Sequence, residues 1–203
     1  MKMKLFAVAA LILMVIVVLS QHGHQLEPLS PEAKILAFGD SLTEGVGASE
    51  GADYPQVLST MLGRTVVNAG ISGETTSEGL IRFEEQLDLW SPGLVLLLEG
   101  GNDFLRNVSE QKVKNNLKQM IEIAKARNIE VVLIAVPQKS LWLAPSEIYA
   151  ELAAQFELLL IEDILLDLLK LPEVKSDSIH FNDEGYYRLA KHIEQRLVKA
   201  GAI

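Results

Sequence analysis

The stretch ILAFGDSLTEG, residues 35–45, joins a short apolar run to a tight turn that carries a serine. A continuous apolar run of this length, without polar alternation, predicts a strand that is buried on both faces of a sheet. The run covers Ile35–Phe38, and four later runs share its character, the last being the weakest: Val66–Asn68, Leu94–Leu98, Val131–Val136 and Leu158–Ile161. Such strands are typical of a parallel sheet that helices cover.

Amphipathic stretches of helical length separate the apolar runs. In residues 110–127, apolar side chains recur every three or four residues, which places them on one face of a helix. The predicted helices are Tyr54–Leu62, Ser77–Trp90, Glu110–Arg127, Ser146–Glu157 and Asp183–Lys199. Because strand and helix alternate along the chain, the sequence predicts one α/β domain over residues 33–203, in which helices cover both faces of a five-stranded parallel sheet.

The amino-acid composition excludes several kinds of functional site. The chain has 203 residues, a length that suits one domain, and it contains no cysteine. A thiol nucleophile, a zinc ribbon, an iron–sulfur site and a lipid-modified N-terminal cysteine are therefore excluded. The formal charge is −9, and since Lys2 and Lys4 are the only charges in the first twenty residues, the remainder carries −11. An acidic chain is unsuited to phosphate contacts, so we expect no nucleic-acid partner.

The N-terminal residues 1–20 follow a pattern of their own. Two lysines precede fifteen residues without a charge or a polar group, Leu5–Leu19, which indicates an export signal. As a helix, fifteen residues rise only about 22 Å, which is short for a bilayer core of about 30 Å. Cleavage near Ser20 and retention as a membrane anchor are both open, and a buried core helix is a third alternative. Residues 21–32, which contain two prolines, are expected to form a tether.

Chemically active residues follow the predicted strands, at the edge where parallel strands end and ligands bind. Ser41 follows the first strand, Gly73 the second and Asn102 the third, each in a turn that contains glycine. Near the C-terminus, Asp177 stands three residues before His180. Together these residues can supply a nucleophile, a base with a carboxylate that orients it, and hydrogen-bond donors for an oxyanion.

Each of these residues has a simpler interpretation when it is taken alone. Ser41 could cap a helix, Asn102 could form a turn, and a glycine could merely permit a tight loop. Asp177 and His180 could pair for structural reasons. With Asp183 they could also bind a metal, although no further histidine or cysteine accompanies them.

In combination, the motifs resemble those of the SGNH hydrolases, which are also called the GDSL esterase/lipase family. Four blocks occur in the family's order between residues 34 and 190: Gly39–Leu42, Asn68–Thr75, Gly100–Asp103 and Asp177–His180. Their joint occurrence is far more specific than any single block. Within the family, residues 66–75 are most similar to the small bacterial periplasmic thioesterases, lysophospholipases and arylesterases. Glu99 departs from the family pattern, which commonly has an apolar residue before the two glycines.

The resemblance implies a flavodoxin-like, three-layer α/β/α fold and a catalytic triad. Ser41 would be the nucleophile, His180 the base, and Asp177 the group that orients the base. The oxyanion would be bound by the N–H groups of Ser41 and Gly73 and by the side chain of Asn102. No cofactor and no metal are implied. Together with the N-terminal segment, the resemblance implies an exported protein that is periplasmic or attached to the outer face of the inner membrane through residues 5–19.

The expected reaction is hydrolysis of a small-molecule carboxylic ester or thioester with an apolar acyl group, through an acyl-enzyme. Two alternatives are open: a carbohydrate O-deacetylase, and a ligand-binding module that has lost catalysis. The segment after the fourth strand, residues 138–145, bears on the choice because it carries Leu141, Trp142 and Leu143. An apolar loop suits an acyl chain better than a sugar, so these three residues are predicted to bind substrate. They could instead cover the edge of a helix.

Overall fold

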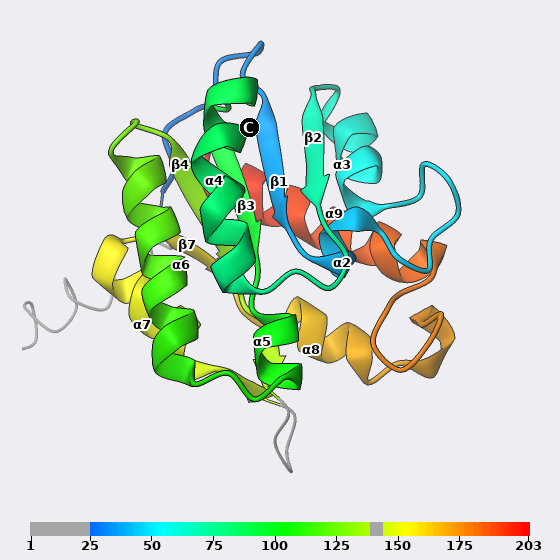
Figure 1. Cartoon of the computed structure of the whole chain (residues 1–203). Helices are drawn as coiled ribbons and strands as arrows, with labels where there is room; N and C mark the ends of the chain where they lie inside the picture. The colour runs from blue at the N-terminus through cyan, green and yellow to red at the C-terminus, as the bar shows by residue number, and fades with distance from the viewer. Residues whose placement is uncertain (1–24, 139–143) are drawn as a thin grey trace, which may run out of the picture.

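The computed structural model describes residues 25–138 and 144–203, and its centre is a parallel sheet of five strands (Figure 1). The strands lie in the order β2-β1-β3-β4-β7. Their bounds are Ile35–Gly39 for β1, Val66–Gly70 for β2, Leu94–Leu98 for β3, Glu130–Ile134 for β4 and Leu159–Ile161 for β7. Every pairing within this sheet is parallel. The fold class predicted from the sequence is confirmed.

Helices cover both faces of the sheet. One face carries α4 (Thr76–Trp90), α6 (Glu110–Lys125) and α7 (Glu147–Phe156), and the other carries α3 (Tyr54–Leu62) and α9 (Asp183–Lys199). Figure 1 shows α4 and α6 in front of the sheet and α9 behind it. The chain passes from β1 to β2 on one side and then to β3 on the other, so right-handed crossovers place α3 and α4 on opposite faces. This reversal makes the carboxyl ends of β1 and β3 a topological switch point, where α/β proteins bind ligands.

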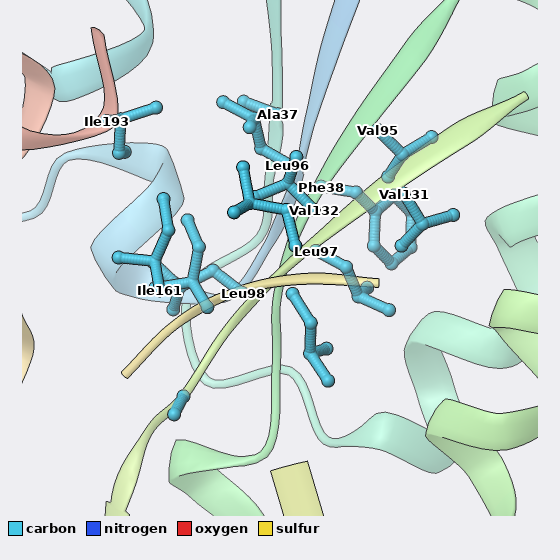
Figure 2. Packing of buried hydrophobic residues seen from close by; sticks show 14 of the residues in the cluster. Ala37, Phe38, Val95, Leu96, Leu97, Leu98, Val131, Val132, Ile161 and Ile193 are labelled. Atoms are coloured by element: carbon cyan, nitrogen blue, oxygen red, sulfur yellow. The ribbon is translucent and has the colours of Figure 1, made fainter. Parts of the chain in front are cut away.

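The core lies on both sides of the two central strands. Every residue of β1 and β3 is buried, as expected for strands that contact helices on both faces. In Figure 2, Ala37 and Leu96 lie on the side of Ile193 from α9, whereas Phe38 lies on the opposite side. There Phe38 meets Phe83 of α4 edge to face, with ring centroids 4.9 Å apart.

Several short elements are not predicted by the sequence pattern. They are α2 (Ser41–Glu44), α5 (Gly101–Leu105), α8 (Ile164–Leu169), a 3₁₀ turn (Pro172–Val174), and a hairpin of β5 (Pro137–Gln138) and β6 (Ala144–Pro145). Segments of two to six residues are too short for hydrophobic periodicity to reveal them. The five long helices, by contrast, agree with their predicted bounds to within two residues.

The stretch before β1 is attached to the domain where the structure describes it. It belongs to the predicted tether, yet the Leu26 N–H donates to the Ala200 carbonyl oxygen at 2.8 Å, and the Leu29 N–H donates to the Ala202 carbonyl oxygen at 2.9 Å. The Leu26 side chain is also buried in the core. The ordered contacts of the domain therefore begin several residues before residue 33.

These contacts lie at the amino end of the sheet. The Leu29 side chain packs against Gly93, the residue that precedes β3. The edge that carries Ser41 is at the other end of the same strands. Among residues 25–138 and 144–203, no helix has the length and apolar character needed to cross a bilayer.

Truncated chains should show whether residues 25–33 stabilise the domain. A chain that starts at Gln25 should fold, whereas a chain that starts at Lys34 should be less stable by about 3 kcal/mol, because it loses the burial of Leu26 and two backbone hydrogen bonds. Urea titrations of the two chains measure the difference in the free energy of unfolding. Equal midpoints would contradict a stabilising role for residues 25–33.

Candidate active site

The first strand brings Ser41 to the carboxyl edge of the sheet. β1 ends at Gly39, and α2 begins at Ser41 with Asp40 as its cap. Asp40 Oδ1 accepts a hydrogen bond from the Leu42 N–H at 3.0 Å, which fixes the turn. A Cβ atom on Gly39 would lie 2.2 Å from the carbonyl oxygen of Leu98, so only glycine fits between β1 and β3 at this point.

His180 connects Ser41 to Asp177 by two hydrogen bonds. His180 Nε2 lies 2.9 Å from Ser41 Oγ, and His180 Nδ1 lies 2.7 Å from Asp177 Oδ2. Asp177 Oδ1 also accepts from the backbone N–H groups of Ile179 and His180, at 2.7 and 2.8 Å. Hydrogen bonds from the His180 backbone and ring, and from the Ile179 backbone, hold the pKa of Asp177 well below its ordinary value. An ionised Asp177 keeps the imidazole proton on Nδ1, so that Nε2 faces Ser41 as an acceptor.

Gly73 and Asn102 lie beside this hydrogen-bonded chain. Gly73 is in the loop after β2, Asn102 is in α5 directly after β3, and both line the same pocket as the serine. Asn102 Nδ2 donates to the Glu74 carbonyl oxygen at 2.9 Å. Gly73 has a φ angle of 79°, which favours glycine, and its carbonyl oxygen accepts from Arg106 at 2.8 Å. The structure thus brings the predicted triad and the predicted oxyanion donors to one edge of the sheet.

The pocket has a volume of about 540 Å³, which is within the range of small-molecule sites. Its apolar walls are formed by Leu42, Phe104, Leu105, Val136, Leu169 and Ile179. Gln138 lines one side of the pocket. The predicted substrate-binding residues Leu141, Trp142 and Leu143 follow Gln138 in the chain and lie outside the described residues. An apolar pocket beside a serine hydroxyl can hold an acyl chain.

Four acidic side chains are buried at or next to residues of the pocket in the chain or in space: Asp40, which lines it, and Glu74, Glu99 and Asp103. Burial raises the pKa of Asp40 to about 6. Asp103 accepts hydrogen bonds from the backbone N–H and the hydroxyl of Thr76, at 2.7 and 2.8 Å. Glu74 forms an ion pair with Arg82, whose Nε donates to Glu74 Oε1 at 2.7 Å. The acids therefore differ in how their charge is compensated.

Sequence reasoning missed Arg82 and most of the pocket wall. Arg82 is one of several charged residues in a predicted helix, and no motif marks it as the buried partner of Glu74. The metal-binding alternative is not supported by geometry, because Asp183 Oδ1 instead accepts from the Ser49 N–H at 2.7 Å. Within the described ranges, no group of three or more histidine or acidic side chains converges on a metal position.

Comparisons with known sequences point to one family. The GDSL-like Lipase/Acylhydrolase family matches residues 37–188. An arylesterase of Vibrio mimicus is 34% identical over 177 residues, which cover 82% of this chain and 88% of that protein. Thioesterase 1/protease 1/lysophospholipase L1 of Escherichia coli strain K12 is 32% identical over 171 residues, which cover 80% of this chain and 82% of that protein.

Solved structures show the same architecture. TesA is 27% identical, with a TM-score of 0.75 over 82% of this chain and 99% of that chain. AlinE4, an SGNH-hydrolase family esterase, is 29% identical, with a TM-score of 0.65 over 85% and 98% of the two chains. The psychrotrophic esterase EstA from Pseudoalteromonas sp. is 22% identical, and its TM-score of 0.76 over 83% and 98% of the two chains shows a likeness of fold.

Replacing Asp40 by asparagine should change how stability depends on pH. The pKa of Asp40 is about 6 in the folded protein against an ordinary value of 3.8, so the wild type loses stability as the pH rises between these values. Relative to the wild type, the free energy of unfolding of Asp40→Asn should therefore rise by about 2 kcal/mol from about pH 4 to about pH 7. Urea titrations at both pH values measure it, with the exposed carboxylate variant Asp88→Asn as control. A constant difference would contradict the raised pKa.

Proposed function

The chain belongs to the GDSL-like lipase/acylhydrolase family, and we propose that it hydrolyses carboxylic esters or thioesters with apolar acyl groups through Ser41, His180 and Asp177. The observation that carries this proposal is the unbroken chain of hydrogen bonds from Ser41 Oγ through both nitrogens of His180 to Asp177. Such a chain activates a serine hydroxyl for nucleophilic attack.

In the proposed reaction, His180 Nε2 removes the proton of Ser41 as Oγ attacks the carbonyl carbon of the substrate. The tetrahedral intermediate collapses to an acyl-enzyme, and His180 gives its proton to the leaving group. Water then attacks the acyl-enzyme with His180 again acting as base, which releases the acid and restores Ser41. Asp177 holds the ring in place and stabilises the charged imidazolium that forms in each half of the cycle.

We assign the oxyanion to the N–H groups of Ser41 and Gly73 and to the side-chain amide of Asn102. All three residues line the pocket. Asn102 Nδ2 donates to the Glu74 carbonyl oxygen at 2.9 Å and makes a longer contact of 3.3 Å with Asp40 Oδ2, so the hydrogen that points to Asp40 is the one that would turn to a ligand. Preorganised donors of this kind stabilise the charge that develops on the carbonyl oxygen in the transition state.

The apolar pocket supports an acyl substrate rather than a sugar. Its lining contains leucine, isoleucine, valine and phenylalanine side chains, which offer no hydrogen bonds to a carbohydrate. The similar proteins named above are an arylesterase and a thioesterase/lysophospholipase. These observations favour neither a carbohydrate O-deacetylase nor a binding module without catalysis.

We also propose that residues 1–20 direct export, so that the enzyme acts in the periplasm or at the outer face of the inner membrane. The sequence pattern of two lysines followed by fifteen apolar residues supports this proposal, and Leu26 and Leu29, a few residues further on, contact the domain. N-terminal sequencing of the protein recovered from cells tests the proposal. Cleavage near Ser20 or retention of the segment in a membrane fraction would fit it, and an intact protein in the cytoplasm would not.

Substitution of the triad tests the proposed function directly. Ser41→Ala and His180→Ala should each lower kcat by roughly 10⁴- to 10⁶-fold, and the double variant should be no worse than either, because the two groups act as a unit. Initial rates on aryl esters and acyl thioesters measure the loss. Ser178→Ala, which also lines the pocket, and His192→Ala serve as matched controls that should keep their activity. A folded Ser41→Ala variant with wild-type activity would exclude the mechanism.

The substrate-binding prediction for Leu141, Trp142 and Leu143 calls for a chain-length series. Each buried methylene contributes about 0.8 kcal/mol, so three or four of them separate long from short chains by about 10²-fold. Leu141→Ser combined with Trp142→Ser should lower kcat/KM for acyl chains of about eight carbons and spare acetate esters. The control is Ile81→Ser with Leu89→Ser, two exposed positions on α4. Equal losses on acetyl and octanoyl substrates would instead favour a structural role for the loop and the deacetylase alternative.

A further inference from the structure

Glu99 is a buried carboxyl group that the proposed mechanism does not use. It follows β3, directly before Gly100 and the helix that carries Asn102, and it is completely inaccessible to solvent. Its Oε2 accepts from the Gly100 N–H at 3.3 Å. Its Oε1 has no hydrogen-bond partner among the described residues as long as the neighbouring acids are ionised. A buried carboxylate with one long hydrogen bond and no cation of its own is strongly disfavoured.

The titratable groups that surround Glu99 are mostly acidic. Asp40 comes from the turn after β1, Glu74 from the loop before α4, and Asp103 from α5. Burial first, and then the charge of Asp40 and the contact with Glu74, raise the pKa of Glu99 well above its ordinary value.

The remaining neighbours do not neutralise Glu99. Arg82 of α4 is engaged by both carboxylate oxygens of Glu74. Tyr149 of α7 donates its hydroxyl hydrogen to the backbone carbonyl oxygen of Glu99, at 2.7 Å, and not to the carboxyl group. The Arg82 guanidinium therefore pairs with Glu74 and not with Glu99.

We propose that Glu99 is protonated in the folded enzyme and donates a hydrogen bond from Oε1 to the Glu74 carboxylate, which makes Glu99 a positioning residue for the oxyanion hole. This inference rests on the proposed function, because it concerns the same site. The two carboxyl groups converge above α4: a Cβ atom added to Gly79 would lie 3.2 Å from Glu99 Oε1 and 3.3 Å from Glu74 Oε2. A hydrogen bond from protonated Glu99 Oε1 to Glu74 would give Oε1 a partner. The pair would then carry one negative charge, which the ion pair of Glu74 with Arg82 balances.

Glu74 links this pair to the oxyanion donors. Its carbonyl oxygen accepts from Asn102 Nδ2 at 2.9 Å, and Gly73 is its direct neighbour in the chain. Arg82 holds its side chain from α4, and the Glu99 hydrogen bond ties it to the end of β3. The positions of two of the three proposed oxyanion donors thus depend on where Glu74 is held.

Ionisation of Glu99 would place a second carboxylate beside the carboxylate of Glu74. Their repulsion would shift Glu74, and with it the Asn102 amide, away from the oxyanion. Because the folded pKa is raised, the stabilising contribution of protonated Glu99 is complete at acid pH and is lost as the pH rises from the ordinary value of 4.5 through the folded value. The value of kcat should fall on the same alkaline limb.

Two substitutions at Glu99 separate a donated hydrogen bond from simple packing. Glu99→Gln keeps a neutral donor toward Glu74 and an acceptor for the Gly100 N–H, so it should retain most of the activity. Glu99→Met fills a similar volume without a donor, and it should lower kcat by about 10- to 100-fold with little change in KM, because the oxyanion donors are misplaced. The exposed control Glu85→Gln should match the wild type. A folded Glu99→Met variant with wild-type kcat would overturn the proposal.

Infrared difference spectroscopy detects the proton without reference to catalysis. At about pH 8, where ordinary carboxyl groups are ionised, the wild type and Glu85→Gln should show the C=O stretch of a protonated carboxylic acid, and Glu99→Gln should lack it. In the wild type, any pH at which the band disappears should also be the pH at which kcat falls. Absence of the band, or its loss without a change in kcat, would refute the assignment. Since the band requires no turnover, it is independent of whether Ser41 proves to be the nucleophile, and it can be read even if Glu99→Met fails to fold.

Discussion

The common level at which three parallel strands end is the constraint on which the rest of the site depends. Ile35 of β1 pairs with Val66 of β2 on one side and with Leu94 of β3 on the other, so the three strands run in step to their carboxyl ends. A serine, a glycine loop and an asparagine, far apart in the sequence, therefore emerge side by side. The histidine and aspartate arrive separately, in the loop before α9, which is carried to the same edge by the packing of α9 against α3.

The acidic side chains below this edge pose an electrostatic problem for any reaction that generates an oxyanion. Negative charge behind the oxyanion hole opposes the charge that develops in it. The charge of each acid is compensated in a different way. Asp103 accepts two hydrogen bonds from Thr76, and Glu74 forms an ion pair with Arg82. Burial raises the pKa of Asp40 to about 6. A neutral Glu99 completes this set, because it removes one of the charges nearest to the donors without removing a hydrogen bond.

How much could be predicted from the sequence depends on the range of the interactions involved. The strands of the sheet and the five long helices follow from local apolar patterns. The candidate residues Ser41, Gly73 and Asn102 follow from motifs just after the ends of three strands, and Asp177 and His180 follow from a motif in the loop before α9. Helices as short as α2 and α5 leave no periodic signal. The pairing of Glu74 with Arg82 and the attachment of Leu26 to Ala200 join segments whose contact is created only by the tertiary fold. Pocket residues such as Leu169 come from elements that no motif marks.

The attachment of Leu26 and Leu29 also fixes the end of the sheet at which the chain enters the domain. The chain enters the domain beside Ala200 and Gly93, at the amino end of the sheet, and Ser41 lies at the carboxyl end, with about 16 Å of strand between the two. In a molecule anchored through residues 5–19, as proposed above, the anchor would join the domain at the end of the sheet opposite the edge that carries Ser41. Substrates dissolved in the surrounding water would reach Ser41 without hindrance, whereas acyl chains still embedded in the membrane would have to leave it first.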